Sequence, residues 1–270
     1  MSKELRLRII TGFTIACGFI LISLIGGMWF RLLAIVMGLC IYYEWTNITG
    51  SISLSFYEKN LRFFSFFIIC FMIFMGFLKI SFFLLMLYSF IDWVISIRKN
   101  RIFWHSLGII YSVLPSISLT YLRGDNAKGL FIVLFILSVV WATDVFAYFI
   151  GRFIGGPKIS SKISPSKTWS GSIGGVISSV SVGMVVFSIF YPNCFQLSLI
   201  LSMMISISCQ LGDLFESYVK RCFGVKHSGW FLPGHGGVMD RFDGLIFSCL
   251  LMSVISFLEI GMDCTSVLTK

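Results

Sequence analysis

Charged residues are scarce in this sequence. Asp, Glu, Lys and Arg make up 12% of its 270 residues, whereas about 25% is usual for a soluble chain. Hydrophobic residues make up 57%, and the mean hydropathy is +0.93. This composition excludes an ordinary soluble domain and indicates a membrane protein.

Several common motifs of nucleotide and metal chemistry are also missing. The sequence has no C-x-x-C pair, no G-x-x-x-x-G-K-[ST] and no G-x-G-x-x-G. Its three His and eight Cys show no zinc-type spacing, and most of the Cys lie in apolar runs, where a Cys is usually a small buried hydrophobe. These absences argue against a P-loop, a dinucleotide-binding fold and a zinc site.

Long apolar runs separated by polar breaks fill most of the chain. One spanning helix needs about 20 apolar residues, so the sequence predicts an all-α, polytopic transmembrane bundle of about nine spanning helices. Residues 1–270 are expected to form a single integral membrane domain, with N-terminal helices over 1–128 and the chemically active helices and loops over 129–270. The apolar runs lie near residues 9–27, 32–45, 62–78, 79–97, 106–122, 129–150, 171–191, 196–212 and 242–260.

The basic residues favour one orientation of this bundle. Alternation from a cytoplasmic N-terminus places sixteen Lys and Arg on the cytoplasmic side and five (Arg31, Lys79, Arg123, Lys128 and Lys270) on the other. Such a bias is the usual positive-inside pattern. The sequence therefore predicts an integral protein of the cytoplasmic (inner) membrane with its N-terminus in the cytoplasm. The net charge of +9 belongs to no separate basic domain, so nucleic acid is not expected as a partner.

A polar segment over residues 151–170, called the lysine loop here, follows the sixth apolar run. It carries Lys158, Lys162 and Lys167 among several Ser and Thr. Lysines, hydroxyls and free amides are the groups that bind a polyphosphate or a lipid phosphate. A cytoplasmic basic loop that touches anionic membrane lipids explains the same residues.

The second polar segment covers residues 213–241 and leads into the last apolar run. Asp240 and Asp243 are three residues apart and would lie on one face of a helical turn. Such a pair of carboxylates, with water and substrate phosphate, suits Mg²⁺. Capping of a helix N-terminus by negative charge is the alternative. The short turn over residues 191–194 predicts a helical hairpin that sets the two polar segments side by side.

Three further acids lie within or at the end of apolar runs. Asp144 lies inside an apolar run about two helical turns before Gly151, and an acid at that depth predicts a functional site. Asp213 ends the eighth run, with Glu216 expected on the same helical face. Asp92 also lies inside an apolar run, although an ion pair with Arg98 or Lys99 would explain an acid there.

Glycines flank His235 in the sequence PGHGG, residues 233–237, called the glycine segment here. Glycines permit close approach of a ligand, and consecutive amides can bind an anion, although a simple turn needs the same residues. Gly171 and Gly175 form a G-x-x-x-G spacing, which predicts close helix packing.

Together the two polar segments resemble a known family, the phosphatidate cytidylyltransferases or CDP-diacylglycerol synthases. The family signature matches Ser217, Lys220-Arg221, Lys226, Pro233-x-His235-Gly236-Gly237 and Asp240-Arg241-Phe242-Asp243. Upstream, Asp144 to Tyr148, the stretch from Lys162 through Lys167 to Trp169, and Gly212-Asp213 also resemble the family. The likeness covers roughly the second half of the chain.

The resemblance implies CTP and phosphatidic acid as substrates, with membrane lipids as surroundings and a homodimer as the assembly. It implies Mg²⁺ as the cofactor, with room for a second cation, held by Asp213, Asp240 and Asp243. The other roles carried over are catalytic for Asp144, Lys220, Arg221, Lys226, His235 and Arg241, and substrate-binding for Lys158, Lys162, Lys167, Ser217, Gly236 and Gly237.

Two residues depart from the family pattern. His227 stands where an Asp usually follows Lys226, and Ser170 stands where many members have Glu. An inactive relative of the family is therefore an alternative. A transporter with Asp144 and Asp92 as ion-coupling acids is the alternative from another class.

Overall fold

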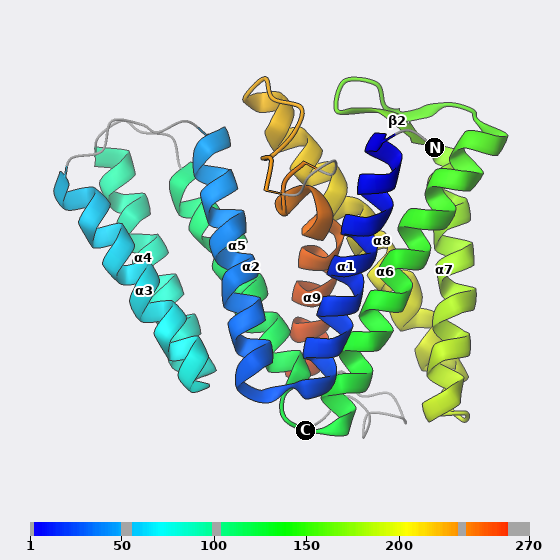
Figure 1. Ribbon diagram of the computed structural model, residues 1–270, viewed down its shortest axis with the longest axis horizontal. Coiled ribbons are helices and arrows are strands. Elements are labelled where there is room, and N and C mark those ends of the chain that lie inside the picture. Colours follow the sequence, from blue (N-terminus) through cyan, green and yellow to red (C-terminus); the bar gives the residue numbers. More distant parts are fainter. Residues whose placement is uncertain (1–2, 50–55, 99–103, 232–235, 259–270) are drawn as a thin grey trace. The chain divides into compact units, whose positions relative to one another are not determined.

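Helices account for nearly all of the structure. The computed structural model describes residues 3–49, 56–98, 104–231 and 236–258, and within these ranges the chain forms nine α-helices and one pair of strands (Figure 1). One helix coincides with each predicted apolar run, so the expected helical architecture is confirmed. Five of the described helices, α2, α4, α6, α7 and α8, are long and apolar enough to cross a membrane. The chain is therefore an integral membrane protein by the length and composition of its helices.

Two compact units make up the chain. The first consists of residues 1–125 together with residues 227–239, and the second consists of residues 126–226 and 240–270. The helices of the first unit are α1 (Lys3–Ile25), α2 (Gly27–Ile48), α3 (Phe56–Met75), α4 (Leu78–Arg98) and α5 (Trp104–Arg123). The second unit holds α6 (Ala127–Ile154), β1 (Lys158–Ser160), β2 (Ser164–Thr168), α7 (Trp169–Phe190), α8 (Phe195–Cys222) and nearly all of α9 (Met239–Phe257).

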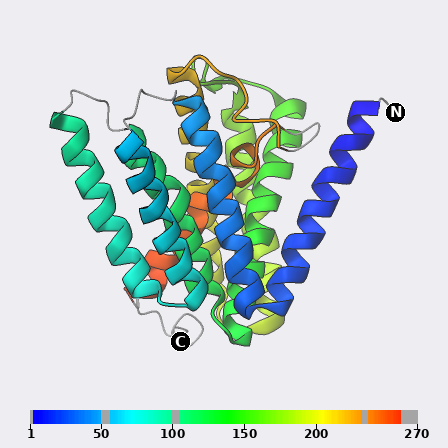
Figure 2. The ribbon, with the colours of Figure 1, turned by 60° about the vertical axis from the view of Figure 1, so that its left-hand side comes forward.

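The first unit is held together by an aliphatic and aromatic core. Residues from α2, α3, α4 and α5 pack around Ile69, Ile73 and Leu85, which are at most 1% exposed. In Figure 2, α3 and α4 run side by side as neighbours within this unit. Asp92 of α4 is buried and accepts a hydrogen bond from Ser106 Oγ of α5 at 2.8 Å. This hydrogen bond between α4 and α5 accounts for the burial of the Asp92 carboxyl group.

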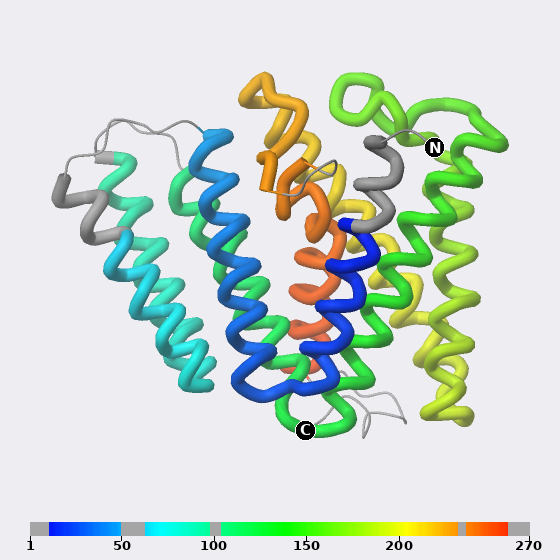
Figure 3. The backbone as a smooth tube through the Cα atoms, viewed as in Figure 1, coloured from blue at the N-terminus to red at the C-terminus, as the bar shows by residue number. Residues whose placement is uncertain are grey.

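In the second unit, α6 and α7 are adjacent and antiparallel, as the tube in Figure 3 shows. A Cβ atom built at Gly171 would lie 2.6 Å from the Ala147 carbonyl oxygen and 3.0 Å from the Gly151 Cα atom. A Cβ atom at Gly175 would lie 2.9 Å from the Ala147 Cβ atom. The predicted close packing at the G-x-x-x-G spacing is confirmed.

Gly171→Ala is expected to destabilise the chain by about 1–3 kcal/mol, the usual cost of overpacking a filled contact. The added methyl group meets the backbone of α6, which cannot rotate away as a side chain can. Thermal unfolding of the purified protein in detergent would measure the change. Gly18→Ala in α1 is the matched control, because no atom lies within 4 Å of a Cβ atom there. Equal unfolding temperatures for the two variants would contradict close packing.

The lysine loop contains regular structure that was not predicted. β1 and β2 pair antiparallel, with Lys158 opposite Thr168 and Ser160 opposite Ser164. The Trp169 amide donates to the Pro157 carbonyl oxygen at 3.1 Å, and the Thr168 side chain accepts from the Gly171 amide at 3.2 Å. The fold is all-α as expected, and the loop adds a small β-hairpin whose last strand leads directly into the N-cap of α7.

Helix α8 is longer than predicted. The expected run ended at residue 212, but the helix continues to Cys222, because residues 213–222 contain the helix formers Leu, Glu, Lys and Arg and no Gly or Pro. At about 1.5 Å per residue, its 28 residues extend beyond a hydrocarbon core of about 30 Å. The extra turns carry Asp213, Glu216 and Lys220 on one face of the helix.

Candidate active site

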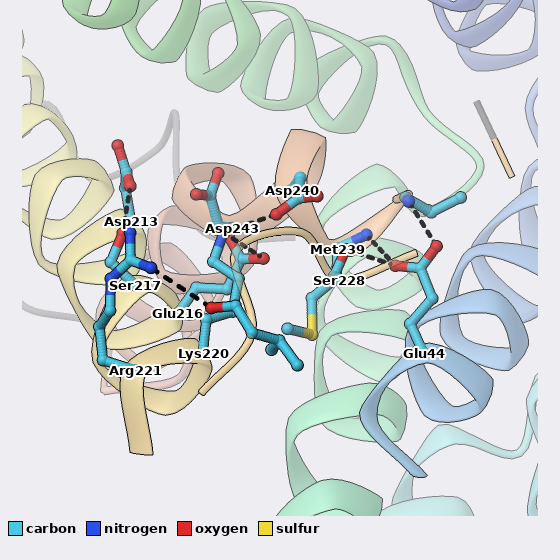
Figure 4. A network of polar contacts seen from close by, with 12 residues as sticks. Glu44, Asp213, Glu216, Ser217, Lys220, Arg221, Ser228, Met239, Asp240 and Asp243 are labelled. Atoms are coloured by element: carbon cyan, nitrogen blue, oxygen red, sulfur yellow. Dashed lines mark hydrogen bonds and ion pairs between the residues drawn. The ribbon is translucent and has the colours of Figure 1, made fainter. Parts of the chain in front are cut away.

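The C-terminal turns of α8 bring acids and bases together within the second unit. Ser217 Oγ donates to Asp213 Oδ1 at 3.4 Å, one helical turn along. Lys220 Nζ lies 3.2 Å from Glu216 Oε1 on the same helix and 2.5 Å from Asp240 Oδ1 in the first turn of α9 (Figure 4). Because α8 continues through Cys222, Asp213 and Glu216 lie three residues apart on one helical face, as expected.

The Lys220 ion pairs are shielded from solvent. The Lys220 side chain is 12% exposed, whereas those of Glu216 and Asp240 are 1% and 9% exposed. Glu216 Oε1 accepts its ion pair from Lys220, and the Glu216 carboxyl group also interacts with the Asp243 side chain. The Lys220 ammonium is thus the charge that compensates Glu216 in the described part of the chain.

Two glycines let α8 and α9 approach closely at the next acid, Asp243. A Cβ atom at Gly212 would lie 2.5 Å from the Asp243 carbonyl oxygen, and one at Gly244 would lie 2.5 Å from Cys209 Sγ. The Asp243 carboxylate accepts from the Gly244 amide at 2.8 Å and interacts electrostatically with Asp213, Glu216 and Asp144. The predicted pair Asp240 and Asp243 therefore lies at the start of α9, as expected.

Asp144 joins this group from α6. Cys209 of α8 donates its thiol to Asp144 Oδ1 at 3.6 Å, and the carboxylate interacts electrostatically with Asp213, Lys167 and Arg241. The Asp144 side chain is exposed on the helix surface even though protein atoms surround it closely. It is therefore accessible from one side, as a residue that meets a ligand must be.

The β-hairpin contributes Lys167 to the same place. Its ammonium group forms an ion pair with Asp213, and Arg221 Nε of α8 donates to the Ile163 carbonyl oxygen in the hairpin turn at 3.3 Å. The prediction that the two polar segments lie side by side is confirmed for these parts of them. Both contacts are formed within the second unit.

These side chains form an acidic cluster of Asp144, Asp213, Glu216, Asp240 and Asp243, with Lys167, Lys220 and Arg241 as the basic groups that interact with it. Five carboxylates against three cations leave an excess of two negative charges. In the part of the chain that the structure describes, no three acidic, His or Cys side chains form a ready-made metal site. Mg²⁺ is commonly bound by one or two carboxylates with substrate phosphates and water, so the excess of carboxylates over cations fits such an ion.

The remaining predicted site residues are distributed around this cluster. Lys158, Lys162, Arg221, Lys226 and Arg241 are exposed, which suits phosphate groups arriving from solvent or from the membrane surface. Gly237 is buried and Gly236 is half-buried with a φ of 89°, a left-handed conformation that favours glycine. His235 lies outside the described residues.

The two departures from the family pattern have different surroundings. Ser170 Oγ donates to the Gly155 carbonyl oxygen and lies 3.1 Å from Thr168 Oγ1, so it supports the N-cap of α7. The His227 side chain is exposed and belongs to the first unit. Ser170 therefore has a structural role here.

One acid with unusual partners was missed by the sequence reasoning. Glu44 of α2 is 0% exposed, and its carboxylate accepts hydrogen bonds from three groups of the 227–239 segment of the same unit (Figure 4). The signal that pointed to Asp144, an acid inside an apolar run, is equally present at Glu44. Its partners lie 184 to 195 residues away, a distance that no local pattern reveals.

Comparison with known proteins identifies the family. The Cytidylyltransferase family matches the chain over residues 6–258. A phosphatidate cytidylyltransferase of Brucella abortus is 36% identical over 260 residues, covering 93% of this chain and 92% of the relative. Another from Staphylococcus saprophyticus is 44% identical over 140 residues, covering 52% of this chain and 54% of the relative. Because the match extends over nearly the whole chain, this protein belongs to the cytidylyltransferase family.

Proposed function

We propose that the chain is a CTP:phosphatidate cytidylyltransferase, which makes CDP-diacylglycerol and pyrophosphate for phospholipid biosynthesis. The family match and the relatives named phosphatidate cytidylyltransferase support this reaction. The observation that carries it is the acidic cluster with its interspersed Lys and Arg, because such a site suits a metal-assisted reaction between two phosphates. The transporter alternative is not favoured by the family.

The reaction forms one phosphorus–oxygen bond and breaks another. An oxygen of the phosphatidic acid phosphate attacks the α-phosphorus of CTP, and the bond to pyrophosphate breaks, so the electron pair leaves with the pyrophosphate oxygen. The second pKa of a phosphate monoester is about 6, so the attacking oxygen is already ionised at neutral pH. The chain therefore needs no strong general base, and its task is to position and neutralise phosphates.

Asp213 and Asp243 are the proposed main ligands of Mg²⁺, with Asp240 as a further ligand and Asp144 as an adjacent carboxylate. Asp213 and Asp243 come from neighbouring helices at their close crossing, whereas Asp240 is already paired with Lys220. When bound, the ion would supply positive charge to the phosphate oxygens. A second cation at the same acids remains part of the proposal.

Basic groups around the cluster would bind the two substrates. Lys167 and Lys220 border the acids and would meet the phosphates of CTP, while Arg241 lies at the entrance of α9. Ser217 and the amides of Gly236 and Gly237 would add hydrogen-bond donors, and His235 is assigned here by resemblance alone. The exposed bases Lys158, Lys162, Arg221 and Lys226 would attract both CTP and the lipid phosphate.

The proposed membrane arrangement has nine spanning helices, with the N-terminus and the active site facing the cytoplasm of the inner membrane. The Lys and Arg distribution supports this orientation. The C-terminal end of α8 lies against the β-hairpin that follows α6, because Arg221 Nε donates to the Ile163 carbonyl oxygen. A homodimer and binding of membrane lipids complete the proposal.

The direct test supplies purified protein with radiolabelled CTP, phosphatidic acid and Mg²⁺. Label is expected in a lipid product and in no product when phosphatidic acid is left out. Labelled lipid formed without phosphatidic acid or without the protein would identify background. No labelled lipid with Mg²⁺, Mn²⁺ or Co²⁺ would favour an inactive relative, and flux across proteoliposomes without CTP would favour the transporter.

A further inference from the structure

Glu44 binds the backbone that leads into α9. Glu44 Oε1 accepts from the Val238 amide at 2.7 Å, and Oε2 accepts from the Met239 amide at 2.8 Å and from Ser228 Oγ at 3.0 Å. Figure 4 shows the carboxylate facing these donors from α2. All four groups belong to the first unit.

The chain around these bonds is shaped to admit the carboxylate. A Cβ atom at Gly229 would lie 2.8 Å from Glu44 Oε1, and one at Gly237 would collide with Ser228 Oγ and Glu44 Oε2. Two residues of this segment are therefore Gly because Glu44 occupies the space that a side chain would need. Gly237, the last residue of the glycine segment, thus leaves room for the Glu44 carboxylate.

Electrostatics favours a carboxylate at this position. The amides at a helix N-terminus have no partner within the helix and carry a partial positive charge, and Met239 is the first residue of α9. Burial without compensation would be costly for Glu44, but three donors satisfy it. Hydrogen bonds to a charged group are about twice as strong as neutral ones.

We propose that Glu44 is a positioning residue that fixes the backbone of residues 237–239 and, through the peptide bond between Met239 and Asp240, the starting point of α9. The first turn of α9 carries Asp240, Arg241 and Asp243, which the proposed function assigns to metal and phosphates. The inference rests on that function for its effect on activity. A residue of the N-terminal half thereby acts on the reaction without touching a substrate.

The test compares Glu44→Gln with Asp92→Asn in full-length protein purified in detergent. Gln keeps the volume of Glu44, but its NH₂ group cannot accept from Met239 or Ser228. Asp92 is the matched control, since it is a buried acid of the same unit that accepts a hydrogen bond from Ser106 of α5. Hydrogen–deuterium exchange of peptides that cover residues 236–240 is the first measurement, and the KM for CTP is the second.

Glu44→Gln is expected to speed amide exchange at Val238 and Met239 about tenfold or more, as the loss of a charged hydrogen-bond partner implies. The KM for CTP is expected to rise about tenfold, because weaker binding raises KM, whereas a merely unfolded fraction lowers only the apparent kcat. Asp92→Asn should change neither quantity. Wild-type exchange or a wild-type KM in Glu44→Gln would overturn the proposal, as would equal effects of Asp92→Asn.

A second variant in the same hydrogen-bond network covers the case in which Glu44→Gln does not fold. If Glu44→Gln does not fold, Ser228→Ala removes one donor to the same carboxylate and should raise exchange at Met239 more than at the helix interior of α2. Unchanged exchange in Ser228→Ala would then overturn the proposal. If the wild type makes no CDP-diacylglycerol, the proposed function fails, while the exchange measurement still decides whether Glu44 holds the start of α9.

Discussion

Asp243→Asn is expected to reduce the formation of CDP-diacylglycerol by about a thousandfold, which corresponds to roughly 4 kcal/mol of lost transition-state stabilisation. Asp243 lies at the close crossing of α8 and α9, among Asp213, Glu216 and Asp144. Asparagine keeps the size of the side chain and an oxygen for the Gly244 amide, but it loses the negative charge that a divalent cation needs.

The same substitution is expected to leave stability unchanged or to increase it. Removing one negative charge relieves the repulsion between Asp243 and the neighbouring carboxylates Asp213 and Asp144. Activity and stability should therefore move independently or in opposite directions. Turnover with CTP and thermal unfolding, measured on the same purified sample, would separate a functional role from a structural one.

Asp92→Asn is the control, because it is expected to lower stability and to leave turnover unchanged. Asp92 is buried and accepts from Ser106 Oγ, so its neutralisation weakens a contact between α4 and α5 without changing the acidic cluster. It should lower the unfolding temperature while the turnover of the folded protein remains. Near-normal turnover in Asp243→Asn would remove Asp243 from the site.

Much of the fold was predictable from the sequence because the membrane imposes a simple pattern. Apolar runs predicted one helix each, and the Gly171 and Gly175 spacing predicted the close packing of α6 and α7 that the structure confirms. The β-hairpin was not predicted, because its strands are short and polar. The true end of α8 was missed because hydropathy detects the apolar part of a helix and not its charged continuation.

The candidate site was predictable where local signals exist. Asp144 and the pair Asp240 and Asp243 stood out as acids in or beside apolar runs, and the structure brings them to one cluster. Glu44 required knowledge of contacts across the length of the chain, because its donors at Ser228, Val238 and Met239 follow six helices later. Sequence periodicity reports which face a residue occupies and not which distant segment meets it.

Lys220→Met is expected to lower the free energy of unfolding by about 3–5 kcal/mol, the usual cost of removing one partner from a buried ion pair. The ammonium group lies 3.2 Å from Glu216 and 2.5 Å from Asp240, and both carboxylates are nearly inaccessible to solvent. Methionine retains the apolar stem of the lysine, so the loss measures the charge. Detergent-based equilibrium unfolding would give the change.

Combining Lys220→Met with Asp240→Asn separates the contribution of Lys220 to stability from its contribution to activity. The double variant Lys220→Met with Asp240→Asn removes one of the unpaired charges, so it should recover part of the lost stability, and the coupling should appear in a double-mutant cycle. CDP-diacylglycerol formation should remain low, because both residues belong to the proposed site. Lys79→Met, an exposed lysine of α4, should change stability by about 0.5 kcal/mol or less. If Lys220→Met has the wild-type free energy of unfolding, Lys220 does not compensate these buried acids. If the double variant regains activity, Lys220 acts on the reaction only by holding Asp240.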